Sequence, residues 1–253
     1  MAALTHSYGW IADLPDHRDL LLAAPRQWPW RTLPPAVDLR SVDTIPVYDQ
    51  GQLGSCTANA IAAALAFTLH KQGLPNVDPS RLYIYFKERQ MEGTINQDGG
   101  AQIRDGMKVV AGGFVPEAEW PYDVTKFTTP PAPIAQLDQD ARRDRVIKYQ
   151  RVLRDFGMRA CLAGGLPFVM GISVYESFEQ ATDGHVPMPS PSEQLLGGHA
   201  ILCEGYTSDQ RYIFRNSWGA NWGEKGFGYL PAAYLNQGGL SSDFWTVQAA
   251  VES

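Results

Sequence analysis

The order of the expected secondary structure constrains the fold of this chain most strongly, because helical segments come first and strand-like segments come second. Helices are expected in three segments that each end at glycine: TANAIAAALAFTLHKQG, SRLYIYFKERQMEG and IRDGMKVVAGG. Later, short apolar runs such as PFVMGISV, HAILCEGY, YIFRNSW, FGYL and FWTVQAAV alternate with breaks rich in glycine, proline and asparagine, as antiparallel strands do. Helices followed by strands predict an α+β fold.

Two proline-dense stretches divide the chain of 253 residues, which is long enough for one or two domains. The first, PWRTLPP, ends a segment without any sustained helical or alternating pattern. The second, KFTTPPAPIAQLD, separates the helical part from the strand-rich part. We therefore expect an N-terminal extension at residues 1–32, a helical domain at 33–135 and a β-rich domain at 136–253.

Charge and hydropathy argue against two classes of partner. The chain has 21 Lys and Arg against 27 Asp and Glu, a net charge of −6 without basic runs, so no nucleic acid partner is expected. The longest apolar stretch, Ala60–Phe67, has eight residues, far short of the ~20 that span a bilayer, so no membrane partner is expected. The N-terminus lacks a basic start followed by a long apolar run. We expect a cytoplasmic protein, or one exported without a visible signal peptide.

The three cysteines, Cys56, Cys161 and Cys203, are an odd and small number, unlike a disulfide framework. Cys161 and Cys203 lie in apolar segments, where buried free thiols are expected. No C-x-x-C or H-x-x-x-H spacing occurs in the sequence. Neither a metal ion nor a cofactor is therefore expected.

Cys56 differs from the other two cysteines, because it follows Gly54 and Ser55 at the expected start of an alanine-rich helix. The unpaired N–H groups and partial positive charge of a helix N-terminus favour the thiolate, which is the reactive form. The alternative interpretation is a small buried residue that opens the helix. A nucleophilic cysteine also requires a base.

His199 is the candidate for that base, since it follows Gly197 and Gly198 and opens the apolar strand AILCEGY, so that its ring can face a cleft. Asn216 has the side-chain oxygen that can accept a hydrogen bond from the imidazole and orient it. Trp218 could cover that hydrogen bond and exclude water from it. The other four histidines are expected at the surface: His6, His17, His70 and His185.

Three motifs together resemble a known family. QGQLGSC, GGHA and NSWGANWGEKGFGY are similar to the cysteine, histidine and asparagine motifs of the papain-like cysteine peptidases. The histidine and asparagine follow the cysteine by 199 − 56 = 143 and 216 − 56 = 160 residues. LPPAVDLR resembles the start of the mature enzymes, and YGWIADLPDHRD resembles bacterial, xylellain-like members. The resemblance extends from about Leu33 to Leu230.

The resemblance implies a two-domain papain-like fold, with a helical domain, an antiparallel β-barrel-like domain and an active-site cleft between them. Cys56 would attack a peptide carbonyl, His199 would be its ion-pair partner and proton donor, and Asn216 would orient the imidazole. Gln50, six residues before the cysteine, would donate to the oxyanion. Thr57 stands where the best-known members have tryptophan, so a smaller wall beside the nucleophile is expected.

Substrate contacts are also implied by the resemblance. Gly99 and Gly100 in DGGA resemble the glycine pair that lets an extended polypeptide substrate bind through its backbone. Gly171 and Ala200 would line a roomy, apolar second subsite. Residues 1–32 are too short for the usual helical propeptide and could instead lie along the cleft as an inhibitory segment.

Two other classes of function remain open. A cysteine-dependent acyltransferase or amidase acting on a non-protein amide would need the same triad in a differently shaped cleft. An inactive peptide-binding module could keep the fold alone, although the presence of Cys56, His199, Asn216 and Gln50 together argues against it.

Overall fold

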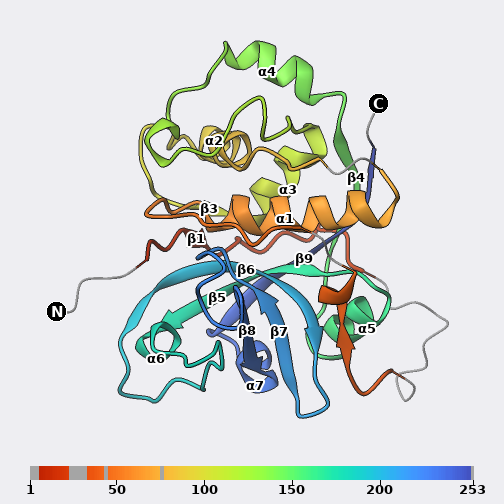
Figure 1. The fold of residues 1–253 in the computed structure, drawn as a ribbon, viewed down its shortest axis with the longest axis vertical. Helices are drawn as coiled ribbons and strands as arrows, with labels where there is room; N and C mark the ends of the chain where they lie inside the picture. The colour runs from red at the N-terminus through yellow and green to blue at the C-terminus, as the bar shows by residue number, and fades with distance from the viewer. Residues whose placement is uncertain (1–5, 23–32, 43–44, 75–76, 252–253) are drawn as a thin grey trace.

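A layer of helices lies against an antiparallel sheet in the computed structural model, which describes residues 6–22, 33–42, 45–74 and 77–251 (Figure 1). Helix α1 (Cys56–Lys71) runs along the boundary between the two layers. It packs against other helices on one side and against strands of the sheet on the other. The α+β class expected from the sequence is confirmed.

The three helices expected from the sequence are present and are joined by a fourth in the same layer. After α1 come α2 (Arg81–Glu92), α3 (Ile103–Gly112) and α4 (Ile134–Ala141). Helix α2 begins where the Ser80 hydroxyl accepts a hydrogen bond from the Tyr83 N–H, and it ends at Gly93, whose φ of 74° is left-handed. Local capping therefore sets both ends of this helix.

Helix α1 is buried on nearly every side. Its buried residues run without a break from Cys56 to Leu69. This burial follows from its position between α2 and α3 on one side and the sheet on the other. A helix in this position must be apolar all round, and its small alanine side chains let both layers approach closely.

The sheet has seven strands in the order β4-β9-β5-β6-β7-β8, and a short strand, β2, pairs with β6. All neighbouring pairs are antiparallel. The strands are β2 (Val37–Asp38), β4 (Arg145–Arg151), β5 (Phe168–Tyr175), β6 (Leu195–Tyr206), β7 (Arg211–Arg215), β8 (Phe227–Pro231) and β9 (Ser241–Val251). Strand β4 was not expected from the sequence, and it forms by pairing with β9, about a hundred residues later in the chain.

Short elements complete the described part of the chain. They are α5 (Phe156–Ala163), α6 (Glu176–Glu179), α7 (Ala232–Asn236), the 3-10 turns η1 (Leu39–Ser41) and η2 (Val124–Lys126), β1 (Trp10–Ile11) and β3 (Ala101–Gln102). The expected domain boundary between residues 135 and 136 falls within α4. Strand β2, from the expected helical domain, pairs with the sheet, Val37 opposite Tyr206.

The N-terminal segment, residues 6–22, crosses the molecule along the boundary between the layers (Figure 1). Strand β1 pairs with β3 of the helical layer in parallel, with Trp10 opposite Ala101. Farther along, Leu22 N–H donates to Arg151 O, and Arg151 N–H donates to Leu20 O, each at 2.8 Å. The segment is thus fixed to the helical layer at one end and to the edge strand β4 at the other. Trp28 and Trp30 of the N-terminal extension lie outside the described residues.

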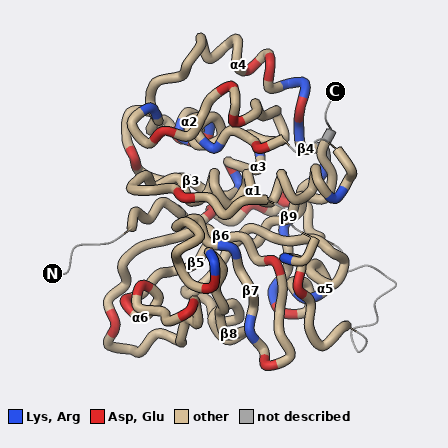
Figure 2. Tube along the Cα trace, viewed as in Figure 1, with Lys and Arg blue, Asp and Glu red and all other residues tan. Residues whose placement is uncertain are grey.

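Basic and acidic positions are interspersed over both layers (Figure 2). Of the helices in the described ranges, none is long and apolar enough to cross a membrane.

Candidate active site

Cys56 is the first residue of α1, as expected, and it is fully buried. Burial raises the pKa of its thiol to about 12, while hydrogen bonds from the backbone of Ala200 and Gly9 act in the opposite direction. The covered thiol is therefore neutral, in contrast to the thiolate expected for a helix N-terminus alone. Thr57 is buried as well and donates to Glu88 at 2.8 Å, so it faces the helical core and does not form a wall of the cleft.

His199 does not open its strand as expected, because β6 already begins at Leu195 and includes both glycines. It lies next to Ala200, whose backbone contacts the Cys56 thiol. Its Nε2 lies 2.8 Å from Oδ1 of Asn216. The Ser217 N–H also donates to this Oδ1 at 2.8 Å, which identifies the atom as the oxygen. Nε2 therefore carries the proton, and Nδ1, which is buried without a partner among the described residues, is left as the basic nitrogen.

The surroundings of His199 are apolar. Burial lowers its pKa to about 4, whereas the hydrogen bond that its ring donates to Asn216 acts in the opposite direction. The Trp218 indole stacks on the imidazole, with ring centroids 4.8 Å apart and planes 28° from parallel. The expected cover over the His199–Asn216 hydrogen bond is thus in contact with the imidazole ring.

Gln50 is held by Ser217, a residue that the sequence analysis did not single out. The Ser217 hydroxyl donates to Gln50 Oε1 at 2.6 Å, and the Gln50 N–H donates to Ser217 O at 2.8 Å. These bonds turn the side-chain NH2 group of Gln50 toward the carbonyls of Ser7, at 3.1 Å, and Leu53, at 2.9 Å. The position of Ser217 directly after Asn216 in NSW was the only signal in the sequence.

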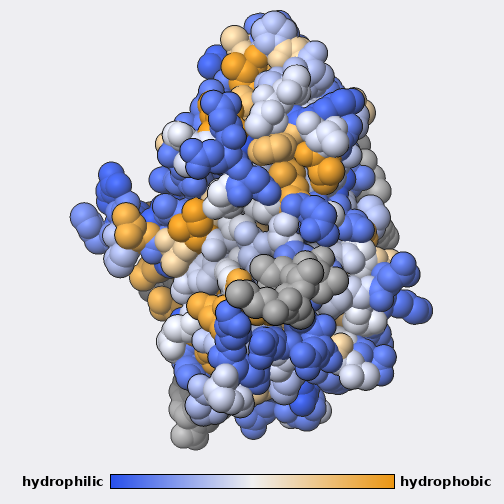
Figure 3. Space-filling model, turned by 90° about the vertical axis from the view of Figure 1, so that its left-hand side faces the viewer, coloured by the Kyte–Doolittle hydropathy of each residue, from blue (hydrophilic) through white to orange (hydrophobic). Residues whose placement is uncertain are grey.

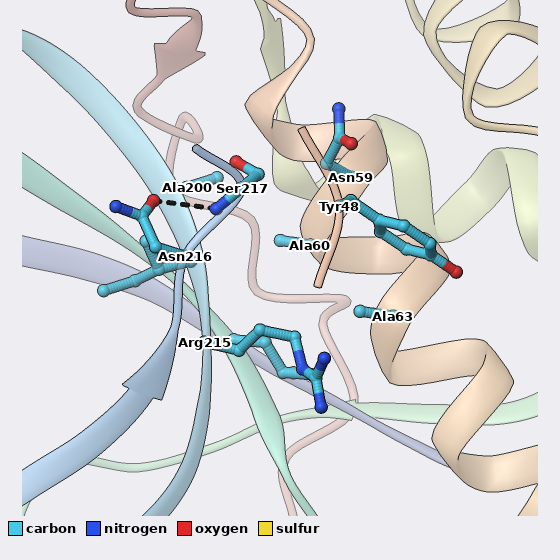
Figure 4. A pocket seen from close by; sticks show the side chains of 10 residues that line it. Tyr48, Asn59, Ala60, Ala63, Ala200, Arg215, Asn216 and Ser217 are labelled. Carbon is cyan, nitrogen blue, oxygen red and sulfur yellow. Dashed lines mark hydrogen bonds between the residues drawn. The ribbon is translucent and has the colours of Figure 1, made fainter. Parts of the chain in front are cut away.

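Helix α1 packs tightly behind these residues. A cavity of about 10 Å³ lies between α1 and the middle of β6 and the end of β7. Asn59, Ala60 and Ala63 line it on one side and Asn216 and Ser217 on the other (Figure 4). A space of this size holds one water molecule at most. Close packing therefore fixes the asparagine loop against the helix that carries the cysteine.

Two of the four expected substrate-binding residues contact the N-terminal segment. A Cβ added at Gly100 would lie 2.1 Å from Gly9 O, and one added at Gly171 would lie 2.0 Å from the Trp10 ring. Ala200 is buried beside Cys56. Gly99 is exposed, and a Cβ there would meet nothing within 4 Å.

The segment also reaches the candidate catalytic groups. The Ser7 carbonyl accepts from Gln50 Nε2, and the Gly9 carbonyl accepts from the Ala101 N–H at 2.7 Å. The expectation that His6 is a surface residue is wrong, since its ring stacks on Trp218 and is half-buried. Neither this position of His6 nor its contact with Glu179 had a signal in the sequence, because both depend on where the segment docks.

In the ranges that the structure describes, no group of three or more His, Cys, Asp or Glu side chains could hold a metal ion.

Comparison with solved structures places the fold. The chain is similar to xylellain, a cysteine protease from Xylella fastidiosa, with a TM-score of 0.91, 40% identity and 97% of each chain covered. It is also similar in fold to the digestive procathepsin L 3 of Tenebrio molitor larval midgut, with a TM-score of 0.71 and 18% identity over 92% of this chain and 75% of that one.

Sequence relatives agree with these structures. An uncharacterized peptidase C1-like protein of Acanthamoeba polyphaga mimivirus is 36% identical over 99% of this chain and 89% of its own length. The model of the papain family cysteine proteases matches residues 33–247. This chain therefore belongs to the papain family of cysteine proteases and is a peptidase, a hydrolase of the thiol protease class.

Proposed function

We propose that the chain hydrolyses peptide bonds through a triad of Cys56, His199 and Asn216 and a thioester acyl-enzyme. The hydrogen bond between His199 Nε2 and Asn216 Oδ1 carries this proposal, because it fixes the tautomer that leaves Nδ1 free to take the thiol proton. The contact between the Cys56 thiol and the backbone of Ala200 supports it, because Ala200 directly follows the histidine.

The reaction then follows from the roles of the groups. The Cys56 thiolate attacks the peptide carbonyl, and the Gln50 NH2 group and the Cys56 N–H hold the developing oxyanion. His199 gives its proton to the leaving amine, which departs. Water, activated by the same imidazole, then hydrolyses the thioester and restores the free thiol.

We further propose that the N-terminal segment inhibits this activity in the intact chain. Gly9 lies against the Cys56 thiol, and Ser7 occupies the oxyanion donor Gln50. Burial raises the pKa of Cys56 to about 12 and lowers that of His199 to about 4. Both pKa shifts favour a neutral thiol and a neutral imidazole. The covered site therefore lacks the reactive thiolate, in addition to being blocked by the segment.

The direction of the segment explains how it could escape cleavage. His6 lies at Trp218, next to the imidazole that protonates the leaving amine, whereas Trp10 lies at Gly171, in the expected acyl-side subsite. A substrate passes from the acyl side to the leaving-group side, and the segment runs the opposite way. A reversed backbone presents its carbonyl groups in the wrong orientation for attack.

Single substitutions in the triad test the proposed reaction. Cys56→Ala and His199→Ala should abolish cleavage of a fluorogenic peptide, whereas Asn216→Ala should lower kcat without eliminating it, because the imidazole loses only its orientation. Melting temperatures of the variants control for misfolding. Substantial cleavage by folded His199→Ala would point to another base. If an added amine captured the thioester faster than water, the activity would be that of an acyltransferase.

A further inference from the structure

His6 lies between an aromatic ring and a carboxylate. Its imidazole stacks on the Trp218 indole, with ring centroids 3.8 Å apart and planes 4° from parallel. Its Nδ1 lies 3.1 Å from Oε2 of Glu179. A flat ring face combined with a nearby negative charge is an arrangement that binds a planar cation, such as imidazolium or guanidinium.

Trp218 and Glu179, the two residues that contact His6, both belong to the folded core. Phe178, which precedes Glu179 in α6, is fully buried. Its ring packs edge-on against Trp218 at 5.5 Å and stacks on Trp222 at 5.7 Å. With the segment docked, the Glu179 side chain is 14% exposed. The contacts of Phe178 fix the Trp218 ring and the helix that carries Glu179 within the folded core.

The segment satisfies both oxygens of Glu179. Oε2 faces His6, and Oε1 accepts a hydrogen bond from the Tyr8 hydroxyl. Within the described part of the chain, His6 is the one histidine, lysine or arginine with a side-chain nitrogen within 4 Å of an oxygen of this carboxylate. When the segment leaves, the Glu179 carboxylate remains at the cleft without these two partners, and a cationic group of a substrate would replace them.

The position that the His6 side chain occupies is on the leaving-group side of the cleft. Trp218 stacks on His199, the group that protonates the leaving amine in the proposed reaction. Residues that follow the scissile bond must therefore pass this pair of rings. The left-hand side of the molecule in Figure 1 is mainly hydrophilic, with separate hydrophobic patches (Figure 3).

We infer that Trp218 and Glu179 form a subsite that selects arginine or histidine at the first or second position after the scissile bond. This inference rests on the proposed triad, which defines the leaving-group side. Arginine suits the place because its planar guanidinium can stack on the indole and donate to the carboxylate at once. Lysine gains less, because its ammonium group does not stack.

The test uses the full-length protein and peptides that differ only by arginine, alanine or glutamate at one of these two positions. The readout is the ratio of kcat/KM values between peptides. Inhibition by the segment lowers kcat/KM for every peptide by the same factor, so the ratio is independent of how often the cleft is open. We expect kcat/KM of the arginine peptide to exceed that of the alanine peptide about five- to tenfold, and to exceed that of the glutamate peptide by more.

Three variants decide the outcome. Glu179→Gln should bring the arginine-to-alanine ratio close to one, and Glu179→Lys should favour glutamate. Glu176→Gln, at an exposed position of the same helix, removes an equal charge and should leave the ratio unchanged. If Glu179→Gln raises kcat/KM for all peptides equally and keeps the ratio, Glu179 only holds the segment and the subsite is refuted. Equal rates for all peptides with the unaltered protein also refute it. Cleavage that persists in Cys56→Ala overturns the triad, and with it this assignment.

Discussion

The N-terminal segment has two parts that hold the enzyme by different means. The cleft part, residues 6–11, covers the candidate catalytic residues mainly through close contacts with small residues. The anchor part, residues 13–22, lies beyond them and is held by ion pairs and hydrogen bonds. In the proposed inhibition, fit to the cleft would determine which residues are covered, and the anchor part would determine how long the segment stays docked, because a tethered group acts at a high effective concentration.

The cleft part fits because glycines on several elements make room for it. A Cβ at Gly198 would lie 2.3 Å from Trp10 O, and a Cβ at Gly9 would lie 1.7 Å from Gly54 O. Trp10 adds a hydrogen bond from its Nε1 to Asp243 at 3.1 Å. Shape dominates here, so one large side chain should carry most of the affinity.

The anchor part depends on charge. Asp19 accepts from Nη2 of Arg104 at 2.8 Å and from Nε of Arg151 at 2.9 Å. The Asp13 side chain is fully buried and accepts from Nη2 of Arg151 at 2.8 Å and from Nε1 of Trp245 at 2.9 Å. Removing one partner of such a shielded pair costs more than at an exposed pair, because the other charge is left without compensation.

Trp10→Ala should give the largest effect, since it removes the main shape contact of the cleft part. We expect kcat/KM of the full-length protein for a fluorogenic peptide to rise about 30-fold, as for the loss of an aromatic anchor worth about 2 kcal/mol. The same substitution should make Cys56 the most rapidly alkylated of the three thiols. Leu14→Ala is the matched control, because Leu14 is 73% exposed in the same segment. Equal effects of both substitutions would contradict a shape-based contact.

Asp19→Ala should have a smaller effect through the anchor part. Losing two cationic partners should raise kcat/KM about five- to tenfold, without any change to the sequence of the enzyme core. Asp16→Ala is the control, because Asp16 pairs with the exposed Arg18 of the segment itself. If Asp19→Ala left the rate unchanged, docking would not depend on charge and the two parts would not differ as described.

The pH dependence of docking should show the smallest effect, because the titrations of Asp13 and His199 change the affinity of the segment for the cleft in opposite directions. Burial, followed by the charge of Asp243, raises the pKa of Asp13 from 3.8 to about 6, so docking takes up a proton and weakens as pH rises from 4 to 6. Burial lowers the pKa of His199 from 6.5 to about 4, so docking weakens as pH falls through the same range.

Asp13→Asn removes the titration of Asp13 and leaves that of His199. Release of the segment from the cleft should then increase more steeply as the pH falls than it does with the unaltered segment. An environment-sensitive dye on Leu14→Cys, in a Cys56→Ser background, reports docking between pH 4 and 6; the other two thiols are buried. Identical pH profiles with and without Asp13→Asn would show that Asp13 does not titrate with docking.

Local patterns were sufficient to predict the elements that carry the site. The segments around α1, α2 and α3 end at or near glycine, and the apolar runs of β5 to β9 are bounded by turn residues, so short-range rules located them. Cys56 at a helix start, His199 at a strand after two glycines and Asn216 in NSW were found in the same way. These rules did not predict strand β4, since it is defined by pairing with the end of the chain.

The sequence by itself determined the fold class, the family and the candidate triad, because each depends on short motifs and their order. Only the tertiary structure decided the partners of those residues: Ser217 on Gln50, the N-terminal segment in the cleft, and Glu179 beside His6. Gln50 and Ser217 are 167 residues apart, and His6 and Glu179 are 173 residues apart. No local pattern encodes such contacts, because they exist only once the helical layer and the sheet have packed against each other.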